Sequence, residues 1–205
     1  MSLPQTLHRL TQAEYLEIER AAEFKSEFFD GEMFSMAGGT PQHSLIATNL
    51  AREFGNRLTT GQCLPYNGDL RIKIEATGLC TYPDLSVICG PLQFAEGTDD
   101  TVINPTLLVE VLSDSTEGYD RGKKFEHYRQ IPTLHGYLLV SQKEPRVEQF
   151  MRQADGHWLL NEAAGLEAAL ELPSLRISLS LAEVFAKVNF VPAPIRIGSP
   201  RSRSN

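Results

Sequence analysis

The sequence predicts a mixed α/β domain built around a central β-sheet, and three observations support this fold class. Helical and strand-like segments follow one another in the order helix, hairpin, helix, strands, helix, strands. Residues 106–112 are almost continuously apolar, which is typical of a central strand that is buried on both faces. Apolar residues recur at helical spacing over residues 42–58, which indicates a long amphipathic helix. We therefore expect a central mixed sheet flanked by helices, with additional β-hairpins.

The first elements have clear local signals. Thr11 is a good N-cap, and Glu14 three residues later completes a capping box, so a helix should run from there to about residues 19–23. Asp30 and Gly31 stand between two short apolar runs, which is typical of a β-hairpin turn. Thr40 followed by a proline indicates the start of the long helix.

The rest of the chain is rich in strands. Apolar and charged residues alternate over 70–75, as in a half-buried strand. A helix should begin near residues 117–119 and end before Pro132. Two further strands are expected at residues 85–88 and 136–140. A second hairpin should pair residues 147–152 with 157–161, and a short helix should follow at 181–188.

Length and composition fit one domain. The chain has 205 residues, of which 41% are hydrophobic, enough for a sizeable core. We expect residues 1–190 to form a single domain and residues 191–205, rich in Pro, Ser and Arg, to form a flexible tail. No apolar run is long enough to span a membrane, and no secretion signal is visible, so we expect a cytoplasmic protein without a membrane partner. The absence of a P-loop and of a GxGxxG motif argues against a nucleotide cofactor.

The net charge restricts the kind of partner. The chain has 19 basic and 26 acidic residues, which gives −7 at neutral pH. Because the tail holds three arginines and no acids, the remainder has 16 basic and 26 acidic residues. This balance excludes a protein that coats nucleic acid by bulk attraction to phosphates, but it permits a local, metal-bridged contact.

The three cysteines show no pairing motif. Cys63, Cys80 and Cys89 form no CxxC pair and are odd in number. We therefore expect reduced thiols rather than a disulfide framework or a zinc site.

Two carboxylates and a lysine are the main candidates for chemistry. Glu110 lies within an apolar strand, where a carboxylate must be paired, metal-bound or protonated. Asp84 follows a proline at the start of another strand. Carboxylates on neighbouring strands can share Mg²⁺ or Mn²⁺, which prefer oxygen ligands. Lys124, on the following helix, could then orient the attacking water or stabilise negative charge on a phosphate in the transition state.

Each candidate also has a purely structural interpretation. Asp84 is equally consistent with capping a turn, and Glu110 with pairing to an arginine. Lys124 could simply pair with Asp120 four residues earlier. Lys123 is an alternative to Lys124, because the phase of a helix is not fixed by sequence alone.

Five segments, taken in order, resemble a known family. They are SEFFDGEMFSMAGGTPQHSLIATNL, YPDLSVI, LLVEVLSDST, GYDRGKKFEHYR and IPTLHGYLLV. Together they are similar to the Uma-type endonuclease family of the PD-(D/E)xK restriction-endonuclease-like superfamily. The resemblance covers roughly residues 10–188 and implies a restriction-endonuclease-like core with a metal-dependent nuclease site.

The resemblance also implies roles for particular residues. Asp84 and Glu110 match the metal ligands, and the backbone carbonyl of Val111 is a further one. The superfamily's usual lysine position is occupied by Leu112, and Lys124 matches the lysine of this family. Supporting positions are matched by four further residues, namely Glu27, His43, Asp120 and Tyr128.

We therefore expect an endonuclease that uses Mg²⁺ or Mn²⁺ to hydrolyse phosphodiester bonds of DNA. A homodimer is also expected, since two related sites suit the cleavage of two strands. Two alternatives remain open. One is a non-catalytic interaction or regulatory module that retains a nuclease-derived metal site, and the other is a nuclease acting on RNA or a nucleotide.

Overall fold

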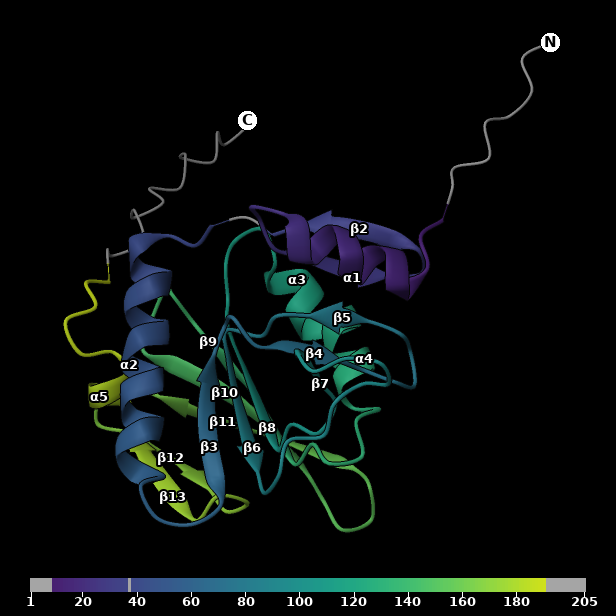
Figure 1. Cartoon of the computed structure of the whole chain (residues 1–205). Helices are drawn as coiled ribbons and strands as arrows, with labels where there is room; N and C mark the ends of the chain where they lie inside the picture. The colour runs from purple at the N-terminus through teal and green to yellow at the C-terminus, as the bar shows by residue number, and fades with distance from the viewer. Residues whose placement is uncertain (1–8, 37, 191–205) are drawn as a thin grey trace, which may run out of the picture.

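The computed structural model describes residues 9–36 and 38–190 and confirms the mixed α/β class. The strands form three sheets rather than one (Figure 1). Alternation of apolar and polar residues shows that a strand has a buried face, but it does not show which strands pair. The expected tail at 191–205 lies outside the described residues.

The largest sheet has six strands in the order β11-β10-β9-β8-β6-β3. It is mixed, because β8 and β9 run parallel while its other neighbours are antiparallel. All five residues of β8 are buried, as expected for a central strand. Its strands are β3 (Cys63–Asn67), β6 (Leu85–Cys89), β8 (Leu107–Val111), β9 (Gly136–Val140), β10 (Arg146–Arg152) and β11 (Trp158–Ala164).

A second sheet has five strands in the order β2-β1-β5-β4-β7. The expected Asp30–Gly31 hairpin joins its first two strands, and both turn residues have positive φ. A two-stranded sheet of β12 (Ala169–Leu172) and β13 (Ile177–Ser180) stands apart from it. The five strands are β1 (Ser26–Phe29), β2 (Glu32–Ser35), β4 (Arg71–Lys73), β5 (Cys80–Thr81) and β7 (Thr101–Val102).

The helices begin where the sequence indicates. Thr11 and Glu14 form the expected capping box, and the Thr40 hydroxyl accepts a hydrogen bond from the His43 amide at 3.1 Å. Among the described residues, no helix combines the length and apolar character that crossing a membrane requires. The helices are α1 (Gln12–Ala21), α2 (Pro41–Arg57), α3 (Glu117–Tyr119), the π-helical η1 (Asp120–Lys124), α4 (Phe125–Tyr128) and α5 (Leu181–Val184).

The six-stranded sheet has an apolar core on each face. On one face, α2 packs Ile46, Leu50 and Phe54 against the sheet. The other face packs against α4 and the second sheet, and its core includes Leu108 and Tyr128. Strand alternation puts the Glu110 side chain on this second face, in the layer between the sheet and the 117–128 helices.

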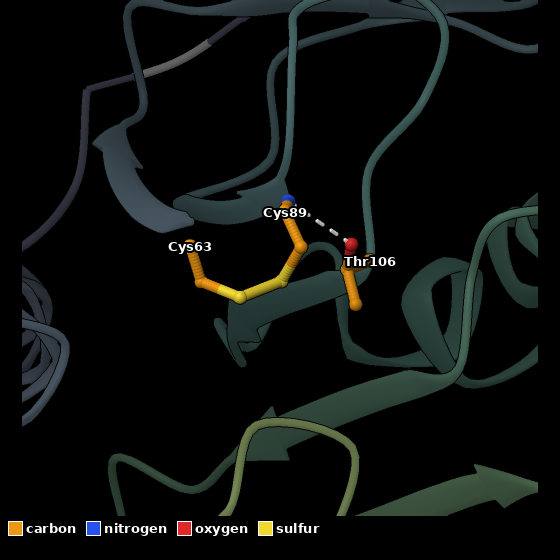
Figure 2. The surroundings of a disulfide bond; sticks show 3 residues. All are labelled: Cys63, Cys89 and Thr106. Atoms are coloured by element: carbon orange, nitrogen blue, oxygen red, sulfur yellow. Dashed lines mark hydrogen bonds between the residues drawn. A yellow bond between two sulfur atoms is a disulfide. The ribbon is translucent and has the colours of Figure 1, made fainter. Parts of the chain in front are cut away.

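The prediction of three reduced thiols is wrong. Cys63 on β3 and Cys89 on β6 lie opposite each other in the antiparallel register and form a disulfide. Figure 2 shows the bond, together with the hydrogen bond that the Cys89 amide donates to the Thr106 hydroxyl at 3.2 Å. The two cysteines are 26 residues apart, so only the strand register brings them together. Cys80 is free and buried, and burial raises its pKa to about 11.

Candidate active site

Asp84 directly precedes β6, and Glu110 lies on the neighbouring antiparallel strand β8, so the β6–β8 register extended by one residue places the two on one face of the sheet. Leu85 of β6 pairs with Val109 of β8, so the next pair along this register is Asp84 with Glu110. Directly opposed side chains of a sheet project from one face, about 5 Å apart at Cβ. The Asp84 Oδ2 atom accepts a hydrogen bond from the Val111 amide at 2.7 Å, which fixes this carboxylate at the end of the strand.

Glu110 is buried and has two polar partners. The Tyr128 hydroxyl donates to Oε1 at 2.7 Å, and the Lys124 ammonium lies 2.9 Å from the same oxygen. Burial raises the pKa of Glu110, and the negative charges of Asp84 and Asp120 raise it further, against the opposing effect of Lys124. The carboxyl group is therefore held in an environment that favours its protonated form unless additional positive charge is present.

Lys124 lies at the centre of three carboxylates. Besides Glu110, its Nζ atom lies 3.2 Å from Glu27 Oε1 and 3.5 Å from Asp120 Oδ1. Burial alone would lower the pKa of this lysine, but the carboxylates, led by Glu110, raise it well above its ordinary value. Lys124 does pair with Asp120, which was the purely structural alternative for this lysine, but that contact is one of three.

The 117–128 helix directs Lys124 inward and Lys123 outward. The Lys124 side chain is only 6% exposed, whereas Lys123 is exposed and pairs with Glu126 at 2.8 Å. The segment is π-helical from Asp120 to Lys124, and π-helical turns are frequent at functional sites. Of the two candidate lysines, Lys124 is therefore the one that contacts the carboxylates.

Glu27 reaches the site from β1 of the second sheet. Its carboxylate accepts hydrogen bonds from the Thr81 hydroxyl and from the Tyr119 hydroxyl. Asp120 is buried, and burial is the main cause of its raised pKa. Sequence reasoning missed Thr81 and Tyr119. A weak signal was available for Tyr119, which directly precedes Asp120 in the family-matching segment.

His43 enters the site from the first turn of α2. Its Nε2 atom lies 3.2 Å from Asp84 Oδ2. The hydrogen bond to Asp84 is the main cause of its raised pKa, and the backbone carbonyl of Val111 contributes as well. A Cβ atom at Gly39 would lie 2.7 Å from the His43 Nδ1 atom, so the glycine leaves room for the imidazole ring.

The structure thus brings together the side chains expected at the site, with Lys124 rather than Lys123 as the lysine. Their charges do not balance, because the site holds four carboxylates and one buried ammonium, which contacts three of them, and the fourth pairs with a partly buried histidine. This excess of negative charge in a poorly solvated site favours an additional cation. The four acids are Glu27, Asp84, Glu110 and Asp120.

The donors fit a divalent cation only in part. Within residues 9–36 and 38–190, no group of three or more His, Cys, Asp or Glu side chains is arranged to hold a metal ion. The opposed carboxylates of Asp84 and Glu110, with the nearby Val111 carbonyl, nevertheless supply hard oxygen donors. Mg²⁺ is commonly held by one or two carboxylates and keeps several waters. These residues therefore suit Mg²⁺ or Mn²⁺ with a largely aqueous coordination shell, and they do not form a closed protein cage.

Comparisons with known proteins identify relatives of this chain. Two proteins of Synechocystis sp. are similar over most of their length. "Uncharacterized protein slr1290" is 38% identical over 182 residues, covering 89% of this chain and 94% of the relative. "Uncharacterized protein sll1609" is 37% identical over 177 residues, covering 86% and 100%.

A solved structure shows the fold. It is the crystal structure of a "putative nuclease belonging to DUF820" from Anabaena variabilis, with a TM-score of 0.70 and 20% identity, covering 86% of this chain and 97% of that one. This likeness confirms the restriction-endonuclease-like fold. Residues 12–183 match the model of a family described as "Putative restriction endonuclease". The chain therefore belongs to this family, Uma2, as the resemblance of its motifs implied.

Proposed function

We propose that this chain is a Mg²⁺- or Mn²⁺-dependent endonuclease that hydrolyses phosphodiester bonds of DNA. One observation supports the proposal above the others. The carboxylate of Asp84, just before β6, lies near enough to that of Glu110 on neighbouring β8 to raise its pKa, and the buried ammonium of Lys124 lies 2.9 Å from Glu110. Membership of a nuclease family makes a phosphodiester the natural substrate for such a site.

Asp84, Glu110 and the Val111 carbonyl would hold the cation. When bound, a divalent cation lowers the pKa of water and polarises a phosphate oxygen. The Val111 amide orients Asp84, and the Tyr128 hydroxyl orients Glu110. These hydrogen bonds keep both carboxylates in place before the substrate arrives, which avoids reorganisation during the reaction.

Lys124 would stabilise the charge that develops on the phosphate in the transition state. An ammonium held in place inside a poorly solvated site stabilises such charge far better than one in water. Glu27 and Asp120 hold this ammonium from two sides. We assign His43 a supporting role, because its hydrogen bond to Asp84 helps to hold that carboxylate in place.

Cleavage assays with matched variants test the proposal. The purified chain should cleave plasmid and oligonucleotide DNA with Mg²⁺ or Mn²⁺ and not with EDTA. Asp84→Asn, Glu110→Gln and Lys124→Met should each reduce the rate by about 100-fold or more, the order of a lost electrostatic group in an active site. Lys123→Met is the control, since Lys123 lies on the same helix and faces solvent.

Other outcomes separate the alternatives. Equal trace cleavage by the wild type and all variants indicates a contaminant and contradicts the proposal. Mn²⁺ binding that depends on Asp84 and Glu110, without cleavage of any substrate, indicates a non-catalytic module. A parallel RNA substrate that is cleaved in preference to DNA corrects the substrate class.

A homodimer is part of the proposal. Two sites related by a two-fold axis suit cleavage of both strands of a duplex, and two-fold symmetry is the commonest among soluble oligomers. Light scattering at working concentration checks this, and a monomer mass contradicts it.

A further inference from the structure

Phe34 is an exposed aromatic residue beside the candidate site. It lies on β2, the edge strand of the second sheet, and 48% of its surface is exposed. It pairs directly with Glu27 in the antiparallel β1–β2 register. Glu27 is one of the three carboxylates that contact Lys124, at 3.2 Å. Phe34 is therefore the cross-strand neighbour of a residue in the site.

The Phe34 ring is on the site's side of the second sheet. Opposed residues in a sheet share a face, so Phe34 projects on the same side as Glu27, with Cβ atoms about 5 Å apart. The neighbouring residues Phe28 and Met33 project to the other side, where they pack against Tyr15 of α1. The Phe34 side chain therefore does not pack in the apolar cluster to which Met33 of β2 contributes.

The site is accessible on the side of Asp84 and His43. The side chains of Asp84 and His43 are 24% and 18% exposed, whereas Lys124 is 6% exposed, so the site opens toward Asp84 and His43. After β2 the chain crosses to the first turn of α2, which carries His43 (Figure 1). Phe34 thus lies on the strand that precedes, along the chain, the helix carrying His43.

We propose that Phe34 stacks on an unpaired nucleobase next to the phosphate held at the site, so that the preferred substrate is single-stranded or locally unpaired nucleic acid. This inference rests on the proposed function. An aromatic side chain binds the exposed face of any base, which makes the contact independent of sequence. In an intact duplex both faces of a base are already stacked, so Phe34 would find a free face only where the strands are unpaired.

Stacking also agrees with the charge of the chain. With 19 basic and 26 acidic residues, the chain does not attract nucleic acid by bulk electrostatics. A stacked base contributes affinity without added positive charge. The part of the binding that Phe34 supplies should accordingly depend little on salt.

Two phenylalanine variants at opposite edges of the same sheet test the inference. Phe94 is 42% exposed and bridges to Val102 of β7, the edge strand opposite β2. Fluorescence anisotropy with EDTA measures binding of a labelled single strand and of its duplex without cleavage. Phe34→Ala and Phe34→Leu should weaken binding of the single strand roughly 5- to 150-fold, the range for loss of one stacked base. Phe34→Trp should bind at least as well as the wild type, and Phe94→Ala should have no effect.

The outcomes separate this inference from the proposed function. Equal binding by the Phe34→Leu variant and the wild type refutes stacking, as does an equal loss for the single strand and the duplex. A change in oligomeric mass without a change in binding places Phe34 at a protein interface and also refutes it. Phe34-dependent binding without metal-dependent cleavage supports stacking and defeats the nuclease proposal. Metal-dependent cleavage that is unchanged in the Phe34 variants supports the nuclease proposal and refutes stacking. Unchanged thermal unfolding of the variants verifies that they fold.

Discussion

Raising the pH should strengthen Mn²⁺ binding at the candidate site. Burial, followed by the like charges of Asp84 and Asp120, raises the pKa of Glu110 to about 8. A carboxylate ligand must lose its proton before it binds a metal. Below pH 8, each pH unit should therefore weaken the apparent affinity about tenfold, or about 1.4 kcal/mol. Between pH 6 and pH 8 the expected gain is about 50-fold from Glu110 alone, because the carboxyl is only half ionised at its pKa.

His43 should release a further proton. Its pKa is raised chiefly by the hydrogen bond to Asp84, so a cation that neutralises Asp84 lowers it again. His43→Gln removes this contribution and should leave the dependence on Glu110, close to tenfold per pH unit. The wild type should show a steeper dependence over the range in which His43 titrates.

Calorimetric titration with Mn²⁺ in two buffers of different ionisation enthalpy measures both the dissociation constant and the number of protons released. The Glu110→Gln variant should bind Mn²⁺ weakly, and its dissociation constant should not change with pH over the range in which Glu110 titrates. Lys123→Met, on the exposed side of the helix, should behave as the wild type does. A dissociation constant that is constant between pH 6 and 8 in the His43→Gln variant, without proton release, refutes the reasoning.

The same shift affects the stability of the metal-free protein. Since the folded-state pKa of Glu110 is raised, the native state keeps a proton that the unfolded chain loses between its ordinary pKa of 4.5 and about pH 8. The free energy of unfolding should therefore fall as the pH rises through this window. Above about pH 8, where Glu110 is ionised in both states, it should fall no further on account of this group. Urea unfolding with EDTA should show this slope in the wild type and a smaller one in Glu110→Gln.

Three further substitutions have definite expectations. Tyr128→Phe removes the hydroxyl that donates to the buried carboxylate and should lower the free energy of unfolding by about 1–3 kcal/mol in urea; no change would contradict the bond's importance. Replacing Cys63 and Cys89 by serine should lower it by about 3.5 kcal/mol, the chain-entropy value for cysteines 26 residues apart; an unchanged midpoint would contradict this value. With Lys124→Met, the single-turnover cleavage rate should fall at saturating Mn²⁺ while Mn²⁺ still binds; loss of both would mean that the lysine organises the carboxylates rather than stabilising the transition state.

Elements with local signals could be predicted from the sequence. The capping box of Thr11 and Glu14 involves residues three apart, and the Asp30–Gly31 turn requires only its own positive φ angles. The central strand over residues 107–111 was predictable because only burial on both faces explains its continuous apolar character. Each of these signals lies within a few residues of the structure it specifies.

Features that depend on register could not be predicted. The partition of strands into three sheets depends on which distant segments pair. The Cys63–Cys89 disulfide is a consequence of the β3–β6 register and has no motif of its own. Counting cysteines and their spacing therefore pointed to reduced thiols.

The candidate site shows the same division. Glu110 could be singled out because a carboxylate in an apolar strand is costly without a partner. The choice between Lys123 and Lys124 required the structure, because sequence alone does not fix the phase of a helix, and only Lys124 contacts the buried carboxylates. Thr81 and Tyr119 were missed since a hydroxyl that supports a carboxylate looks like any other polar residue in sequence.

The acidity of the site suggests an order of binding. The site holds four carboxylates and one buried ammonium, so without a cation it repels the negative charge of a phosphate. A divalent cation at Asp84 and Glu110 removes most of this excess, and it also favours the ionised form of Glu110. The body of the chain offers no compensating basic surplus, because it has more acidic than basic residues. Nucleic acid should therefore bind productively only after the metal, and the contact that attracts it beforehand should be one that does not depend on charge.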